Sequence, residues 1–263
     1  MPGLVLLLAG FLVPSVAMLF APPDVSTSEI FARLGEMLKD PYDLEVIGRT
    51  VGLALVVTVI CVFLGFPIAY WLARSRSRWS GVLLAVAIFP LMLSNVVRTF
   101  GWLVILGSKG ALGQLLVSLG LVETAPQLLY TKVAIVLGLT QLFLPLAIIS
   151  CYSAVAQVDP GLDDASRGLG ASRIRTLWNI VIPLTMPGIV VAATLVFAGS
   201  VTAYTTPYLL GGSSQRMLST QLFTYASTTV DWASASATAL IMTVLVFLVS
   251  GLSSLMGRKG ATS

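Results

Sequence analysis

Long runs of apolar residues divide the chain, and most polar residues lie in the segments between them. A helix needs about 20 residues to cross the roughly 30 Å hydrocarbon core of a bilayer. Six runs reach this length: residues 4–22, 50–72, 82–106, 133–152, 187–210 and 235–256. Barrel strands would be shorter and would alternate in polarity. The pattern therefore predicts an all-α integral membrane protein with six transmembrane helices, in a single domain over residues 1–263.

The first run has a second interpretation as a cleaved signal peptide. It lacks a positively charged region before Leu4, and five further spans follow it. Both features favour a retained membrane helix.

Composition narrows the class of protein. Apolar residues make up 57% of the chain and charged residues only 10%, whereas soluble domains carry about 25% charged residues. A water-soluble globule, low-complexity disorder, a collagen and a disulfide scaffold are all disfavoured.

Basic residues indicate the orientation, because cytoplasmic loops of membrane proteins collect Lys and Arg. With the amino terminus inside, eight basic residues fall in the inside segments and six in the longer outside segments; the inside segments are 1–3, 73–81, 153–186 and 257–263. We therefore expect both termini of this multi-pass protein in the cytoplasm. The basic residues form no long block, so nucleic acid is not an expected partner.

The chain lacks the residues that several kinds of chemistry need. There is no histidine and no phosphate-binding Gly-Lys-Ser/Thr loop, and all eleven acids lie outside the six runs. Proton-driven carriers usually place ionisable groups in the membrane. We predict no catalytic residue, no metal site and no cofactor, so energy for uphill transport would come from another subunit. An ATP-independent channel and an intramembrane Ser/Lys enzyme remain as alternatives. Cys61 and Cys151, at different depths, are predicted to be free thiols.

Polar residues inside three runs mark a candidate solute pathway. Arg98 lies about 12 Å from the outer end of its span at 1.5 Å per residue, where an unpartnered arginine is costly. The candidate pathway residues are Ser94, Asn95, Arg98, Gln141, Tyr204 and Thr205. The alternative is structural, because arginine can snorkel and Ser or Thr often bonds its own helix backbone.

Glycine and proline predict interruptions. Five prolines lie in apolar runs, where kinks are expected: Pro14, Pro67, Pro90, Pro145 and Pro207. Residues 107–122 are too short and glycine-rich for a span and predict an interfacial or re-entrant helix.

The loop at 153–186 contains a well-marked short helix. Asp159 is a good N-cap, Pro160 suits the first helical position, and Gly170 can adopt the left-handed conformation that ends a helix. Ser172 is expected to cap a second helix, 173–181, that ends before Pro183. The first helix suits insertion into a partner's groove, although an ordinary loop helix would look the same.

The same loop resembles the EAA loop of ABC importer permeases, which reads Glu-Ala-Ala, three residues, Gly, nine residues, Ile-x-Leu-Pro. Here the spacing is identical, with Asp for Glu, Ser for the second Ala and Ile for Leu. The matching residues are Asp164, Ala165, Ser166, Arg167, Gly170, Ile180 and Pro183. The resemblance extends from the second span to the sixth and is closest to spermidine/putrescine-type permeases, through residues 90–98, 206–212 and 231–232.

This resemblance implies a type I ABC importer permease fold and a multi-pass location in the bacterial inner membrane. The matching loop residues would contact the ATPase. The implied partners are two copies of a cytoplasmic ABC ATPase, a second and homologous but different permease chain, an extracytoplasmic solute-binding protein and membrane lipid. A polyamine-like solute follows from the subgroup. The local charge instead favours an anionic or zwitterionic solute such as a phosphonate or an opine, because Arg98 is the charged group in the spans.

Overall fold

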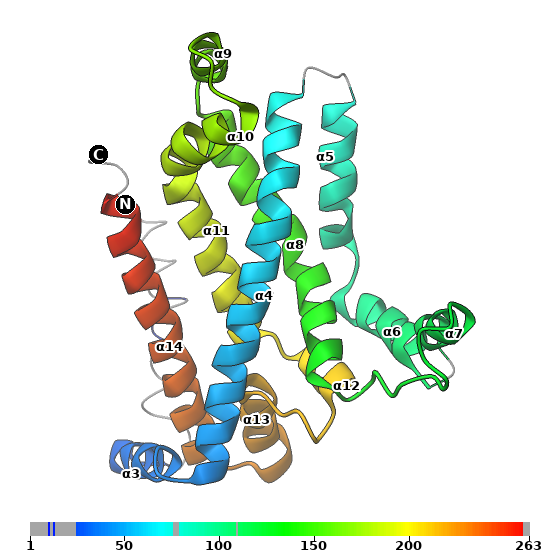
Figure 1. Ribbon diagram of the computed structural model, residues 1–263. Coiled ribbons are helices and arrows are strands. Elements are labelled where there is room, and N and C mark those ends of the chain that lie inside the picture. The colour runs from blue at the N-terminus through cyan, green and yellow to red at the C-terminus, as the bar shows by residue number, and fades with distance from the viewer. Residues whose placement is uncertain (1–9, 11–12, 14–24, 76–78, 109, 260–263) are drawn as a thin grey trace.

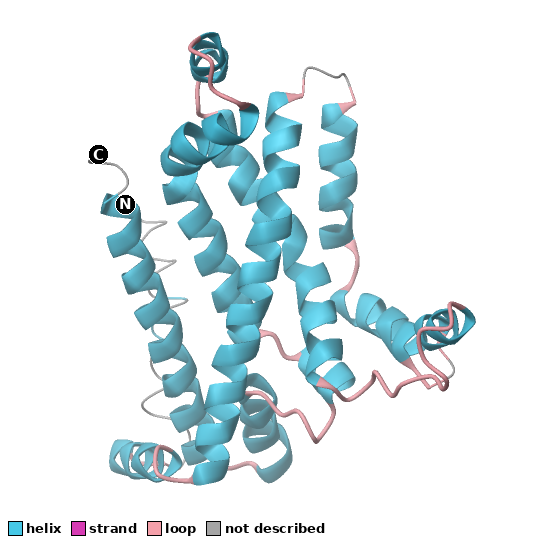
Figure 2. Ribbon diagram, in the orientation of Figure 1, coloured by secondary structure: helices cyan, strands magenta, loops and turns pink. Residues whose placement is uncertain are grey.

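A computed structural model describes residues 10, 13, 25–75, 79–108 and 110–259. Within these ranges the chain consists of helices and connecting loops (Figures 1 and 2). All but two residues of the first predicted span, 4–22, lie outside the described residues, and Pro14 is among them.

The centre of the bundle consists of α4 (Pro41–Arg74), α8 (Lys132–Ala156) and α11 (Ile182–Thr202), with α14 (Trp232–Lys259) packed beside α11 (Figure 1). Small residues allow these helices to approach closely, as is common in membranes. A Cβ atom at Gly65 of α4 would lie 3.3 Å from the Ala147 Cβ atom of α8. At Gly188 of α11 it would lie 2.2 Å from the Ala154 Cβ atom, so a larger residue would push α8 and α11 apart.

Among the described residues, four helical segments are long and apolar enough to cross a membrane: 41–74, 132–156, 173–202 and 232–253. The stretch 95–118 reaches that length only when two shorter helices, 95–106 and 111–118, are counted together. The predicted spans at 50–72, 133–152 and 235–256 each lie on one continuous helix. α4 begins nine residues before its predicted start, because Asp40 accepts a hydrogen bond from the Tyr42 backbone N–H and Pro41 occupies the first helical position.

The prediction of one span at 82–106 was wrong. The chain forms α5 (Ser80–Ile88), the short 3₁₀ turn η2 (Phe89–Met92), an extended Leu93 and then α6 (Asn95–Leu106). Pro90 lacks the N–H that would bond the Val86 carbonyl, and its ring crowds the preceding turn. Figure 1 shows α5 running alongside α4 and α6 turning away from it toward α7. α7 (Ala111–Ser118) is the short helix expected within 107–122.

The prediction of one span at 187–210 was also wrong. α11 ends at Thr202, Ala203 is extended, and α12 (Thr205–Gly211) begins a new helix. Pro207 lies in the first turn of α12, where its missing N–H removes no helical hydrogen bond.

The second loop helix does not end before Pro183, contrary to the prediction. α10 (Arg173–Thr176) continues through the π-helical turn η3 (Leu177–Val181) into α11. The Ile182 N–H bonds the Leu177 carbonyl, five residues back, and this wider turn carries the helix past the proline. α4 and α8 likewise continue past Pro67 and Pro145.

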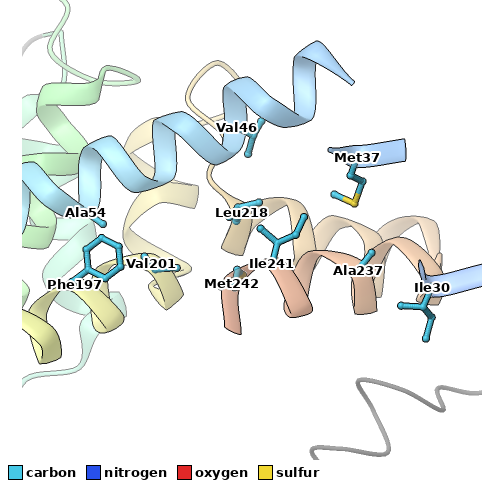
Figure 3. Close-up of a cluster of buried hydrophobic side chains, with 10 residues drawn as sticks. All are labelled: Ile30, Met37, Val46, Ala54, Phe197, Val201, Leu218, Ala237, Ile241 and Met242. Atoms are coloured by element: carbon cyan, nitrogen blue, oxygen red, sulfur yellow. The ribbon is translucent and has the colours of Figure 1, made fainter. Parts of the chain in front are cut away.

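An apolar core lies at the end of the molecule that holds α3 (Thr27–Met37) and α13 (Leu218–Thr224). α3, whose N-terminus is capped by Ser26, buries Ile30 and Met37 against α14, and the cluster reaches Phe197 on α11 (Figure 3). Its ten buried members are Ile30, Met37, Val46, Ala54, Phe197, Val201, Leu218, Ala237, Ile241 and Met242.

Hydrogen bonds to Asp231 and Ser234 cap the start of α14 and join it to α3. The Ser234 backbone N–H and hydroxyl donate to the two carboxylate oxygens at 3.0 and 2.6 Å, and the Arg33 Nε donates to the Ser234 hydroxyl. Partial burial raises the pKa of Asp231, but the hydrogen bonds from Ser234 and the nearby charge of Arg33 outweigh it and lower the pKa below its usual value.

The loops divide between two ends of the bundle. α9 (Pro160–Gly168), the carboxyl end of α4, the start of α5 and the carboxyl end of α14 lie at one end, whereas α3 and α13 lie at the other (Figure 1). For the described parts of 73–81, 153–186, 23–49 and 211–234, this division matches the grouping of loops predicted from the sequence. Which end faces the cytoplasm stays a prediction. Cys61 and Cys151 are buried free thiols, as predicted.

Candidate functional site

The loop helix α9 is capped at both ends. The Gly161 backbone N–H donates to the Asp159 carboxylate at 2.8 Å, and Pro160 is the first helical residue. Gly170 has a φ of 87°, and a Cβ atom there would meet no atom within 4 Å. The predicted helix and its glycine stop are confirmed. Ser172 also caps α10 as expected, accepting a hydrogen bond from the Arg175 backbone N–H.

The residues of the loop motif divide into exposed and buried groups. Asp164, Ala165, Arg167 and Gly170 are exposed at the end of the molecule. Ser166 is buried, with its hydroxyl 2.7 Å from the Thr176 hydroxyl of α10. A serine at this motif position therefore joins α9 to α10, a contact that alanine would not make. Ile180 and Pro183 do not lie with these residues but farther along, on η3 and α11.

An ion pair ties α9 to the end of α4. The Arg74 Nε atom lies 2.8 Å from the Asp163 Oδ2 atom, and each side chain is only 14% exposed. The Arg74 Nη1 donates to the Val158 carbonyl at 2.9 Å, so the arginine also holds the link that enters α9. The buried Arg74 Nε and Nη2 and Asp163 Oδ1 have no hydrogen-bond partner, so the two side chains are held by an ion pair without an aligned hydrogen bond. We call this contact the Arg74–Asp163 tether.

A cavity of about 630 Å³ lies between α9, α10 and the end of α4. Its lining includes Trp71, Arg74, Asp163, Asp164, Arg167 and Arg173. Acidic and basic side chains therefore both line this open cavity beside the exposed face of α9. This arrangement suits contact with another protein and contains no group positioned for bond-breaking chemistry.

Hydrogen bonds hold the predicted pathway region together at the break between α5 and α6. The Trp102 Nε1 of α6 donates to the Gln141 Oε1 of α8 at 2.7 Å, and the hydroxyls of Thr99 and Thr206 lie 3.4 Å apart, between α6 and α12. The Asn95 backbone carbonyl accepts a hydrogen bond from the Thr99 hydroxyl. Ser94, which precedes α6, is exposed.

Arg98 is turned toward the backbone of this break. Its Nη1 donates to the Pro90 carbonyl at 3.0 Å, and its buried Nε has no hydrogen-bond partner. The guanidinium thus bridges η2 and α6, which is the structural alternative considered from the sequence.

The break between α11 and α12 places Tyr204 in an aromatic cluster. Its ring stacks on Tyr208, with centroids 5.2 Å apart, and on Phe223 of α13, at 4.4 Å. The adjacent Thr205 is half-buried. We call these three rings the Tyr204–Tyr208–Phe223 cluster.

Sequence reasoning did not single out Arg74, Tyr208 or Phe223 as site residues. Arg74 follows the end of an apolar run, so it was interpreted only as a topology signal, and no spacing rule links it to Asp163. Tyr208 lies four residues after Tyr204, which would have been a usable signal had the helix break at 203 been foreseen. Phe223 comes from a separate element and carried no local signal.

The helical bundle, its apolar spans and the exposed loop helix define a membrane-embedded transport subunit. The chain belongs to the family of binding-protein-dependent transport system inner membrane components, which it matches over residues 65–259. It is therefore a permease component of an ABC importer, located in the inner membrane, and it is not itself an enzyme.

Two relatives of known function are named for different solutes. The chain is 32% identical to the spermidine/putrescine transport system permease protein PotB of Salmonella typhimurium, over 86% of this chain and 77% of that protein. It is 33% identical to the molybdenum transport system permease protein ModB of Azotobacter vinelandii, over 79% of this chain and 91% of that protein.

Solved structures share the fold. A bacterial alginate ABC transporter, in complex with an alginate-bound periplasmic protein, matches with a TM-score of 0.81 at 15% identity, over 100% of this chain and 93% of that chain. The MetNI methionine ABC transporter in an inward-facing conformation matches with a TM-score of 0.62 at 16% identity, over 82% and 95%. The type I ABC importer permease fold predicted from the sequence is confirmed.

Proposed function

We propose that this chain forms half of the translocation pathway of an ATP-driven importer for polyamine-like solutes such as putrescine and spermidine. Its partners would be a second, homologous but different permease chain, two copies of a cytoplasmic ABC ATPase and an extracytoplasmic solute-binding protein. Support comes from the spermidine/putrescine relatives and from the periplasmic protein bound to the alginate transporter.

The observation that carries the coupling role is the way α9 is attached. Its Asp164, Ala165 and Arg167 are exposed and would face the ATPase, while its other contacts lead into three long helices. A short link joins it to α8, the Ser166–Thr176 contact joins it to the α10–α11 helix, and the Arg74–Asp163 tether joins it to α4. When the ATPase subunits close on ATP, a displacement of α9 would move all three helices and open the pathway toward the binding protein.

The two candidate substrates differ in charge, since a polyamine is a cation and molybdate is an anion. The molybdenum permease relative favours an anion, and Arg98 suggested the same from the sequence. In the structure, the Arg98 Nη1 donates to the Pro90 carbonyl, which supports a structural role for this side chain. The guanidinium keeps its positive charge and further donors, so the polyamine proposal is supported by the spermidine/putrescine relatives and not by Arg98.

Transport by the reconstituted complex tests the proposal. Proteoliposomes containing this chain, the second permease and the ATPase would be given binding protein and either spermidine, putrescine or molybdate. ATP-dependent uptake of the amines and not of molybdate is expected, and Arg98→Gln should leave it within about twofold of wild type, since the side chain does not contact solute. Uptake of molybdate alone would replace the polyamine assignment, and flux without ATP would contradict an importer.

A further inference from the structure

Tryptophan side chains mark the α9 end of the bundle. Trp71 lies in the last turn of α4, Trp79 directly precedes α5, and Trp178 lies on η3. Each of the three is more than half exposed. Tryptophan is enriched where the hydrocarbon of a bilayer meets its headgroups, and Trp71 is the last residue but one of the predicted span 50–72. This end of α4 therefore reaches the level at which lipid headgroups are expected.

The cavity between α9, α10 and the end of α4 lies at this level. Its volume of about 630 Å³ is within the range of about 300–1,000 Å³ that is usual for small-ligand pockets. Trp71 of α4 and Ile174 and Leu177 of the α10–η3 helix give the cavity apolar walls, and Ile174 is 70% exposed. A ligand that has an apolar part can cover these walls.

The charged walls of the cavity leave one arginine available to a ligand. Arg74 and Asp163 neutralise each other in the tether. The side chains of Arg167, Arg173 and Asp164 are exposed and make no hydrogen bond or ion pair with the part of the chain that the structure describes. Arg167 and Asp164 carry opposite charges and belong to α9, on the face that would contact the ATPase. Arg173 on α10 is therefore the unpaired positive charge that lines the cavity.

An arginine beside apolar walls at headgroup level suits an anionic phospholipid. A guanidinium can donate two parallel hydrogen bonds to phosphate oxygens, and basic pockets between membrane helices on the cytoplasmic side bind anionic headgroups. Free phosphate offers the same oxygens but has nothing that covers Trp71 and Ile174. A zwitterionic lipid brings its own positive group, which Arg173 repels. An anionic lipid alone uses both the charge and the apolar walls.

We propose that this cavity is a binding site for an anionic phospholipid of the leaflet on the α9 side of the membrane. Arg173 holds the phosphate, and the glycerol and the first acyl methylenes pack against Trp71 and Ile174. The headgroup fills the space between α4 and α10, beside the Arg74–Asp163 tether. The site goes beyond the proposed function, and it does not depend on which solute the transporter carries.

Lipid binding to the purified complex tests the site. Native mass spectrometry in neutral detergent is expected to show stronger binding of phosphatidylglycerol than of phosphatidylcholine. Arg173→Gln should weaken phosphatidylglycerol binding about tenfold or more, as loss of a hydrogen bond between charged groups predicts. Arg173→Lys keeps the charge and should retain most of the binding. Arg175→Gln is the matched control and should bind as wild type does, because it removes the same charge from an exposed α10 side chain that does not line the cavity.

Contrary outcomes would point to other occupants of the cavity. Displacement of phosphatidylglycerol by an excess of inorganic phosphate would indicate a free-phosphate site and overturn the lipid assignment. Equal weakening by Arg173→Gln and Arg175→Gln would indicate attraction to general surface charge. Unchanged lipid binding in Arg173→Gln, together with loss of ATPase stimulation, would assign Arg173 to the ATPase contact. Either of these last two results, or equal binding of the two lipids, would overturn the site. Lipid bound elsewhere in the complex is common to all variants, so differences among them report this cavity.

Discussion

Gly170 determines where the exposed loop helix stops. Its φ of 87° lies in the left-handed region, and a Cβ atom there would meet nothing within 4 Å, so space is not limiting. The constraint is the backbone itself, because a β-branched residue adopts positive φ only with strain of about 1–3 kcal/mol. A residue that tolerates positive φ is thus needed for the path of the chain between α9 and α10.

We therefore expect Gly170→Val to uncouple the transporter while leaving membrane insertion intact. The strained turn would reorient α9 relative to α10 and reduce ATPase stimulation by the loaded binding protein. Gly170→Asn is the matched control, since asparagine tolerates the left-handed conformation and should retain most of the stimulation. Normal stimulation and uptake in Gly170→Val would contradict the role of this turn in coupling.

At the scale of elements, local signals predicted some helices better than others. The short helix α9 was predicted in full because Asp159, Pro160 and Gly170 mark its ends through local backbone chemistry. Hydropathy alone located α4, α8 and α14, because a lipid-facing helix must be apolar along its length.

The same hydropathy signal failed at the two interrupted helices. Lipid requires only apolar side chains, so residues on both sides of a break look like one span. Pro90 and Pro207 accompany breaks, whereas helices continue past Pro67 and Pro145. What separates the two cases is tertiary: the guanidinium of Arg98 bonds the Pro90 carbonyl, and Ser219 bonds Ala203 at the second break. Ser219 is distant from Ala203 in sequence, and Arg98 reaches Pro90 only because the helix is broken between them. The periodicity of apolar residues along the chain therefore does not identify either contact.

The Arg74–Asp163 tether provides a prediction at this scale. Asp163→Asn would leave the largely buried Arg74 guanidinium without its charge partner and is expected to lower the free energy of unfolding by about 1–3 kcal/mol. Spermidine uptake should fall with it, because α4 would no longer follow α9. The double variant Arg74→Gln with Asp163→Asn removes both charges and should recover part of the loss, with a coupling energy of about 0.5–3 kcal/mol.

Thermal unfolding of the purified complex and uptake in proteoliposomes would measure these two effects. Asp164→Asn is the control, because this neighbouring carboxylate is exposed and its removal should leave the unfolding temperature nearly unchanged. Strictly additive losses from the two tether substitutions would mean that the ion pair does not join α4 to α9 in the working complex.

For the whole molecule, the loops gather at two opposite ends of the bundle, so the orientation depends only on which of these ends faces the cytoplasm. α9 and the carboxyl end of α4 share one end of the bundle, and α3 and α13 share the other (Figure 1). The first end includes the segments richer in basic residues, and positive charge near span ends is retained in the cytoplasm. An ATPase can reach the exposed face of α9 only if that end is cytoplasmic, so charge and coupling require the same orientation.

Cysteine labelling from each side of the membrane would test this orientation. Cys61 and Cys151 are fully buried, so the native chain provides an unreactive background for a membrane-impermeant maleimide. Leu169→Cys, at a position 91% exposed beside α9, should react in inside-out vesicles only, and Leu121→Cys, at a position 67% exposed after α7, should react in right-side-out vesicles only. Vesicles without the ATPase subunit keep Leu169 uncovered. The reverse pattern would place α9 outside the cell, where no ATP-driven coupling through it is possible.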